Sequence, residues 1–249
     1  MPKRIIANYH GPLFADVHAG SSWKYVAWNA LWDDLKSGNK RAAQLLAAAP
    51  GIYFLLREHE KGKIGYNNIY ERFNERVLSQ IPVSEVERYL REYAALPETQ
   101  EKLDRDMLGA ITKAYHAGAC CDILSTGCGF TIRKTIDAYT EGMPLFGEIV
   151  ANSLVRNGKG SEFEMAVYTP LERCHGLLGL LNHGDNRGLV YVGHGDEELP
   201  CMKKVAAEGG RIVIAPSAGR EFKALASGLF GEKASTPRTR EEIFRALAD

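Results

Sequence analysis

The stretch RIIANYHGPLF, residues 4–14, decides the fold. Arg4 to Ala7 predict a short buried strand that ends at Asn8, and the Gly-Pro pair at 11–12 turns the chain directly afterwards. This shape is typical of a strand that delivers polar side chains to a site. Asn8 and His10 are therefore the first candidate functional residues, although an amide and an imidazole are an unusual pair for such a loop.

The pattern on either side of this stretch sets the architecture. Helical periodicity follows from about residue 21 to residue 118, and from Ala119 onward buried strands alternate with helices. Such alternation predicts a parallel sheet covered on both faces. The sequence therefore predicts an α/β protein with a Rossmann-like, doubly wound parallel sheet and an inserted all-helical cap. We expect the core at 1–18 and 117–249 and the cap at 19–116.

Within the helical block, local signals predict where helices begin and what they bury. Ala49-Pro50-Gly51 predicts a break between two helices. The sequence SEVE, beginning at Ser84, has the spacing of a capping box with Ser84 at the N-cap. Tryptophans at helical spacing predict the core of the block, namely Trp23, Trp28 and Trp32.

The composition narrows the class of protein. In 249 residues the 31 Lys and Arg balance the 31 Asp and Glu, so no basic excess points to nucleic acid or to a membrane surface. The apolar run near the N-terminus is too short for a signal peptide, and no stretch approaches a membrane span. Five cysteines without a CxxC pair favour reduced, buried thiols, including adjacent Cys120 and Cys121, and a cytoplasmic location.

Three polar residues follow predicted strand ends. Asn8, Ser125 and His194 each come directly after an apolar run. In open parallel sheets, sites lie at the carboxyl ends of the strands. We therefore expect these three side chains to converge.

Four short motifs occur in order along the chain. Asn8–Leu13 reads NYHGPL, Asp122–Phe130 reads DILSTGCGF, Arg173 lies near the start of a later helix, and Gly193–Glu198 reads GHGDEE. Together they resemble the haloacid dehalogenase (HAD) superfamily, nearest its phosphoserine-phosphatase-like branch. In that family the corresponding motifs are Asp-x-Asp-Gly-Thr-Leu, a strand ending in Ser or Thr, a Lys, and Gly-Asp-x-x-x-Asp. The resemblance covers nearly the whole chain and implies a HAD-like core with phosphatase-like hydrolase chemistry.

The resemblance also implies roles for individual residues. Asn8 takes the position of the nucleophile and His10 that of the general acid and base. An imidazole with a reference pKa of about 6.5 suits proton transfer near neutrality. The residues implied to bind the ligand are Ser125, Thr126, Arg173 and Gly193.

The departures from the family pattern are concentrated at its carboxylates. An amide is a very poor nucleophile, so Asn8 cannot form the family's phospho-aspartate. The metal positions become Asn8, His194 and Glu198, a poor set for Mg²⁺, which prefers anionic oxygen ligands. A Zn²⁺ or Fe²⁺ site at His10, His194 and Glu198 remains open. No cofactor is assigned.

The lost negative charges favour metal-free binding of an anion. The leading hypothesis is a HAD-like protein without the aspartyl nucleophile, a pseudophosphatase, that binds a phosphate ester or carboxylate between core and cap. One alternative is a divergent hydrolase that uses His10 as acid and base, with a transition metal at His194 and Glu198. Another is a non-catalytic scaffold or regulatory subunit. Whether catalysis remains, which ligand binds and which oligomer forms are not predicted.

Overall fold

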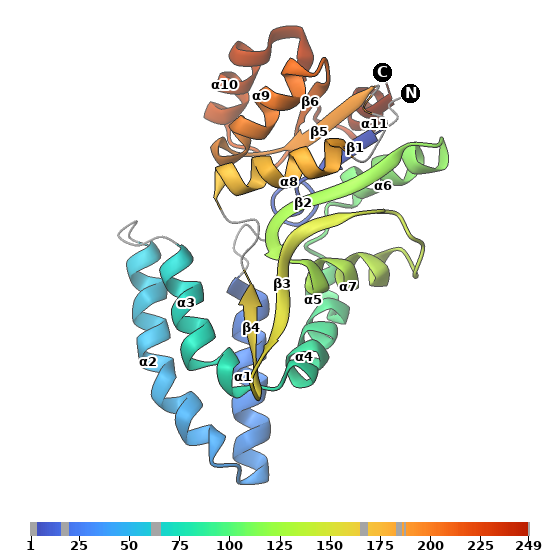
Figure 1. The fold of residues 1–249 in the computed structure, drawn as a ribbon. Coiled ribbons are helices and arrows are strands. Elements are labelled where there is room, and N and C mark those ends of the chain that lie inside the picture. Colours follow the sequence, from blue (N-terminus) through green and yellow to red (C-terminus); the bar gives the residue numbers. More distant parts are fainter. Residues whose placement is uncertain are drawn as a thin grey trace.

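The computed structural model describes residues 4–15, 20–60, 66–164, 169–182, 186 and 188–248. Its centre is a seven-stranded sheet in the order β4-β3-β2-β1-β5-β6-β7 (Figure 1). All neighbouring strands are parallel except β3 and β4, which form an antiparallel hairpin. The strands are β1 Arg4–Ala7, β2 Cys120–Cys128, β3 Ile149–Asn157, β4 Gly160–Glu164, β5 Leu189–Gly193, β6 Arg211–Ile214 and β7 Ala234–Ser235.

Helices cover both faces of the sheet, as the alternating pattern predicts. Ile5 packs with α6 (Arg105–His116), α7 (Gly129–Tyr139) and α11 (Arg240–Ala248). Its neighbour Ile6 points to the other face, covered by α8 (Pro170–Asn182), α9 (Leu199–Ala207) and α10 (Arg220–Phe230). The predicted α/β class with a mostly parallel sheet is confirmed. None of the described helices has both the length and the apolar character needed to cross a membrane.

Strand β1 lies in the middle of the sheet. Arg4 is level with Cys120 of β2 on one side and with Leu189 of β5 on the other. All four of its residues are buried, which explains the continuous apolar run in the sequence. The one charged member is paired, since Arg4 Nε lies 2.8 Å from Asp122 Oδ2. This position makes Asn8, the next residue, the central point of the sheet's carboxyl edge.

A helical lobe lies beside the carboxyl edge (Figure 1). It consists of the described parts of α1 (Gly20–Ser37), α2 (Arg41–Glu60), α3 (Tyr66–Arg76), η1 (Leu78–Gln80) and α4 (Val83–Ala95), with an apolar cluster of its own. The short α5 (Pro97–Gln100) leads from it to α6, which packs with α11 and the sheet. The division into core and cap at residues 19 and 116 stays a prediction. Short 3-10 helices are η2 (Asp196–Glu198) and η3 (Gly231–Lys233).

Local expectations in the lobe were wrong in three places. Helix α2 continues through Pro50, because packing against α1 and α3 supports the turn that lacks one backbone donor. Helix α4 begins at Val83, with Pro82 and not Ser84 at the N-cap and with no side-chain cap. The Pro82 carbonyl accepts from the Glu85 and Val86 N–H groups. Trp28 and Trp32 are 59% and 44% exposed on the outer side of α1, and of the three tryptophans Trp23 alone is buried.

The β3–β4 hairpin joins the sheet to the helical lobe. Ser161 Oγ donates to the carbonyls of Leu78 and Ile81 at 3.1 and 2.9 Å. Gly160 lies so close to the backbone of Ser79 that a Cβ atom there would collide with it. The hairpin therefore gives the lobe a non-covalent attachment to the sheet, in addition to its covalent connections along the chain.

Candidate functional site at the carboxyl edge

The carboxyl edge brings the predicted residues together in two groups. Asn8 follows β1 directly, and its backbone N–H donates to the carbonyl of Val192 on β5 at 3.0 Å. His194 follows β5. Ser125 differs from the prediction, because β2 continues to Cys128 and its register against β3 shifts after Leu124. That irregularity still places Ser125 beside the loop that follows β1.

The loop after β1 is held by its own backbone and by one glycine. Gly11 N–H donates to Phe14 at 2.8 Å, and Ser217 Oγ donates to the Gly11 carbonyl at 2.7 Å. Gly11 has φ of 90°, a left-handed conformation that favours glycine. A Cβ atom at Gly11 would also collide with the His194 ring. The loop therefore requires glycine here for two independent reasons.

On the β5 side the polar groups form a buried Glu198 cluster, made of Asn8, Arg173, His194 and Glu198. Glu198 is 0% exposed. Its Oε1 accepts from Asn8 Nδ2 and lies 3.3 Å from His194 Nδ1, and its Oε2 accepts from the His194 backbone N–H at 2.8 Å. Arg173 Nη1 lies 3.6 Å from Glu198 Oε1. Both carboxylate oxygens are thus used within the protein.

Charge in the Glu198 cluster is balanced by Arg173, which is 2% exposed. Burial alone would lower the pKa of Arg173, but the nearby carboxylate of Glu198 raises it above its usual range. Burial, reinforced by Glu198, also raises the pKa of Tyr191. In the part of the chain described, Asn8 Oδ1, Arg173 Nε and Tyr191 Oη have no hydrogen-bond partner. The cluster is therefore charge-balanced but retains unused polar atoms.

On the β2 side lies the Ser125–His10 pair, which combines a fully buried serine with a half-buried imidazole. Ser125 Oγ is 3.3 Å from His10 Nδ1 and accepts from the Gly127 N–H at 3.1 Å. A Cβ atom at Gly127 would press on the His10 ring, so this glycine makes room for the imidazole. Thr126 is half-buried, and its carbonyl accepts from Asn152 Nδ2 at 2.8 Å. The pair presents a hydroxyl and an imidazole beside each other.

This arrangement does not fit the metal that the family resemblance implies. Mg²⁺ needs hard anionic oxygens, and the oxygens of Glu198 face the Asn8 amide, a backbone N–H and the Arg173 side. The alternative Zn²⁺ or Fe²⁺ set is not assembled either. Throughout the described ranges, no three His, Cys, Asp or Glu side chains are grouped in a way that could hold a metal ion. His10 instead contacts Ser125, while His194 contacts Glu198.

Several residues that shape the site were not singled out from the sequence. Gly11 and Gly127 stand inside the quoted motifs, and their position next to the candidate histidines was the available signal. Tyr191 showed only strand periodicity. Gly193, expected to bind ligand, lies so close to Glu198 that a Cβ atom would collide with the carboxylate. Its structural role is to make room for that carboxylate, and its ligand role stays a prediction.

Solved structures resemble this arrangement along almost the whole chain. A protein of unknown function from Bordetella pertussis aligns over 95% of this chain and 99% of its own, with 11% identity and a TM-score of 0.65. A phosphoserine phosphohydrolase-like protein from Francisella tularensis aligns over 99% and 100%, with 16% identity and a TM-score of 0.54. A HAD family hydrolase from Salmonella enterica aligns over 93% and 72%, with 12% identity and a TM-score of 0.52. The chain has a HAD-like fold.

The structural similarity establishes the HAD-like fold, but at identities this low it does not establish the chemistry of the site. No family model and no curated protein sequence matches the chain. The fold predicted from the four motifs is confirmed. The roles predicted for Asn8, His10, Ser125, Thr126 and Arg173 stay predictions.

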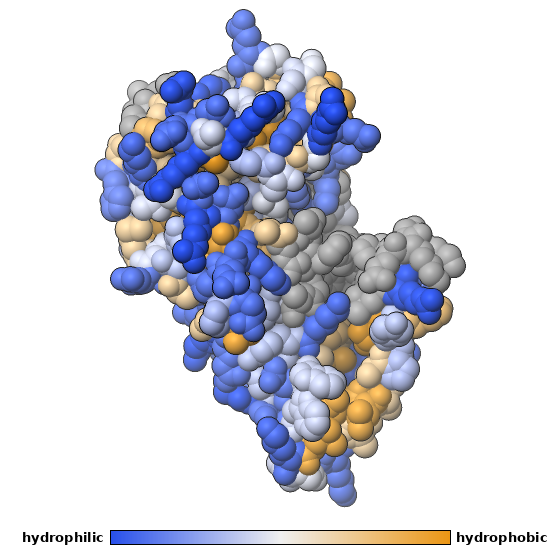
Figure 2. Space-filling view, turned by 180° about the vertical axis from the view of Figure 1, so that it is seen from behind, coloured by the Kyte–Doolittle hydropathy of each residue, from blue (hydrophilic) through white to orange (hydrophobic). Residues whose placement is uncertain are grey.

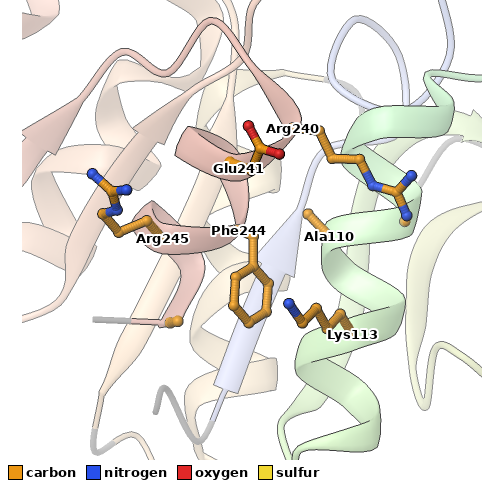
Figure 3. A pocket seen from close by; sticks show the side chains of 8 residues that line it. Ala110, Lys113, Arg240, Glu241, Phe244 and Arg245 are labelled. Carbon is orange, nitrogen blue, oxygen red and sulfur yellow. The ribbon is translucent and has the colours of Figure 1, made fainter.

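Two hollows of this HAD fold lie away from the predicted site residues. One, of about 790 Å³, lies on the helical lobe among apolar side chains that include Trp28, Leu46 and Tyr53, in the lobe where Figure 2 shows apolar residues gathered. The other, of about 580 Å³, lies between α6 and α11 (Figure 3), with Lys113 Nζ 3.8 Å from the centre of the Phe244 ring. Neither contains a residue of the Glu198 cluster or of the Ser125–His10 pair.

Proposed function

We propose that this chain binds a small anion, a phosphate ester or a carboxylate, at the carboxyl edge of the sheet, and that it does not use the metal-dependent aspartyl mechanism of HAD phosphatases. The observation that carries the proposal is the Asn8–Glu198 contact. The residue at the nucleophile position, Asn8, is an amide, and its side-chain N–H already donates to the buried carboxylate of Glu198.

The electrostatics of the edge support an anion. Asn8 and His194 bring no fixed negative charge, and Arg173 offsets the charge of Glu198. A HAD phosphatase site with several carboxylates needs a cation before an anionic group can approach. Here that repulsion is reduced, because the buried carboxylate of Glu198 accepts from the Asn8 amide and the His194 backbone N–H and is paired in charge with Arg173.

The Ser125–His10 pair is the proposed point of contact. A serine hydroxyl and a protonated imidazole both donate to anionic oxygen, and charge-assisted bonds of this kind are the stronger ones. Similar structures include a phosphoserine phosphohydrolase-like protein and a cytosolic 5'-nucleotidase. Both names refer to phosphate-ester substrates, which makes a phosphate ester the first ligand class to test here.

The second candidate is a divergent hydrolase that uses His10 as general acid and base. The 3.3 Å contact of His10 Nδ1 with Ser125 Oγ favours it, because a positioned imidazole beside a hydroxyl is one arrangement for proton transfer. It differs from the first candidate in turning over a substrate. Steady-state hydrolysis of a chromogenic phosphate ester in the presence of a chelator, lost in His10→Ala, would favour it.

Calorimetric titration and thermal melts of the full chain test the leading proposal. Inorganic phosphate and acetate are the probes, each with and without a chelator, because a ligand of the folded state raises the melting temperature. We expect a rise that the chelator does not remove and that Ser125→Ala and His10→Ala reduce. His116→Ala, on the exposed end of α6, is the matched control and should keep the rise. Mg²⁺-dependent phosphatase activity that Asn8→Ala abolishes would overturn the proposal, and no response to either anion would favour the scaffold alternative.

A further inference from the structure

Two thiols lie in contact between α8 and α9, the helices that cover the sheet face to which Ile6 points. Cys174 lies on α8 and Cys201 on α9, and their Sγ atoms are 3.7 Å apart. All five cysteines are free, and Cys120, which was expected to be buried, is exposed at the start of β2. A disulfide has an S–S distance of about 2.05 Å, and at 3.7 Å the two sulfurs are already in van der Waals contact.

The two thiols stand beside the Glu198 cluster. Cys174 directly follows Arg173, and Cys201 comes one helical turn after Glu198. The same two segments therefore make both the thiol contact and the 3.6 Å contact of Arg173 with Glu198. A covalent bond between the thiols would fix these segments relative to each other.

The two thiols differ in how an oxidant reaches them. Cys174 is half-buried, whereas Cys201 is fully buried. Burial, with Cys174 as its neighbour, raises the pKa of the Cys201 thiol, so this thiol stays protonated and unreactive toward solvent species. An oxidant therefore meets Cys174 first, and Cys201 is placed to react with the product.

We propose that Cys174 and Cys201 are an oxidation site that forms a reversible disulfide and locks α8 to α9. Hydrogen peroxide, or another peroxide, oxidises the Cys174 thiol to a sulfenic acid and releases one water. The Cys201 thiol then gives its proton to the hydroxyl group of the sulfenic acid, its sulfur attacks the Cys174 sulfur, and the hydroxyl group leaves as a second water. Two thiols lose two electrons and two protons, and the peroxide is reduced to two waters. A thiol reductant reverses the bond, as is typical of redox-sensing disulfides in reducing compartments.

This inference is independent of the proposed function, because it needs no ligand at the carboxyl edge. Its experiment exposes the purified full chain to hydrogen peroxide, alkylates the remaining thiols and maps peptides without reduction. We expect a cross-linked peptide that joins 174 to 201, an intact mass lower by two hydrogens and a rise in melting temperature of about 5 °C, all reversed by dithiothreitol.

Two variants make the result specific. Cys174→Ser, at the half-buried position, should lose the cross-link and the rise in melting temperature while it still folds. Cys120→Ser is the matched control and should keep both, since Cys120 lies on β2 and is exposed. Peroxide treatment that leaves 174 and 201 unlinked would overturn the inference. So would oxidation of Cys174 to the sulfinic acid alone, or a cross-link that runs only between chains through Cys120.

Discussion

The two groups at the carboxyl edge differ in how their polar atoms are paired, although each contains one residue of the loop after β1, Asn8 in one and His10 in the other. The Glu198 cluster on the β5 side uses both oxygens of its carboxylate on donors of the protein itself. The Ser125–His10 pair on the β2 side is a single 3.3 Å contact with an imidazole that is half-buried. We therefore predict that the residues at the metal positions stabilise the fold, whereas our proposal assigns the ligand to the Ser125–His10 pair.

The largest expected effect is on the stability of the Glu198 cluster. Glu198→Ala removes the buried partner of Arg173 and leaves that charge only the exposed Glu197, whose Oε2 lies 3.3 Å from Arg173 Nη2, so we expect a loss of about 3–5 kcal/mol in the free energy of unfolding. Urea unfolding measures it. Glu198→Gln keeps an acceptor and should lose less. Glu197→Ala removes the exposed partner of the same guanidinium and should lose no more than about 1 kcal/mol, because an exposed ion pair contributes little. A loss for Glu198→Ala no larger than that of Glu197→Ala would show that the cluster does not hold the fold.

Gly11 tests how closely the loop is fitted to His194. Gly11→Ala should cost about 1–3 kcal/mol, because it adds backbone strain at φ of 90° and a collision with the imidazole. Gly38→Ala is the matched control, since Gly38 has φ of 67° but nothing within 4 Å of an added Cβ. Thermal melts of the two variants separate collision from strain. Adding His194→Ala to Gly11→Ala should recover part of the loss, and equal losses at Gly11 and Gly38 would contradict the fit.

The Ser125–His10 pair should matter less for stability than the Glu198 cluster. Ser125→Ala removes the acceptor of the Gly127 N–H, so we expect a loss of about 1–2 kcal/mol. Chemical denaturation gives this value, and the same preparation gives the phosphate response described above. Ser125→Thr should retain the hydroxyl but crowd a fully buried position. A Ser125→Ala variant less stable than Glu198→Ala would reverse the assignment of the two sides.

The smallest expected effect is that of the exposed Asp33–Arg88 ion pair on the helical lobe. The difference between its loss and that of Glu198→Ala measures how much burial adds to the ion pair of Arg173. The Tyr89 hydroxyl, and then Arg88, hold the pKa of Asp33 below its ordinary value of 3.8. The stabilisation that the ionised Asp33 carboxylate contributes is therefore complete above about pH 3.8. It is lost as the pH falls through the lower pKa that Asp33 has in the folded state. Asp33→Asn should lose no more than about 1 kcal/mol at neutral pH. Unfolding curves against pH should converge with those of the unaltered chain in strong acid, and a loss that persists there would contradict the assigned cause.

The sequence was sufficient to predict the fold because the decisive signals were local and ordered. An apolar strand before Asn8, a long helical interval and alternating strands and helices together specified the sheet. The positions of Asn8, Ser125 and His194 at strand ends followed from the geometry of parallel sheets.

The hydrogen-bond and packing partners of the site residues could not be predicted, because they depend on distances between residues on different strands of the sheet. Nothing local in the sequence indicated that the Asn8 amide donates to Glu198, or that His194 packs on Gly11. The exposure of Trp28 and Trp32 was missed for a related reason. Their spacing suits burial, but what α1 packs against decides which face is covered, and that depends on α2 and α4.

The central position of β1 has a consequence for synthesis. Its four residues leave the ribosome long before the strand that pairs with its second edge, because β5 begins about 185 residues later. At about 5–20 residues per second, the interval is roughly 10–40 s. During that time the helical lobe can form from local contacts, while the strand that carries Asn8 waits with at least one edge unpaired. The nascent chain is therefore most exposed to aggregation or chaperone capture at the very segment that later organises the carboxyl edge.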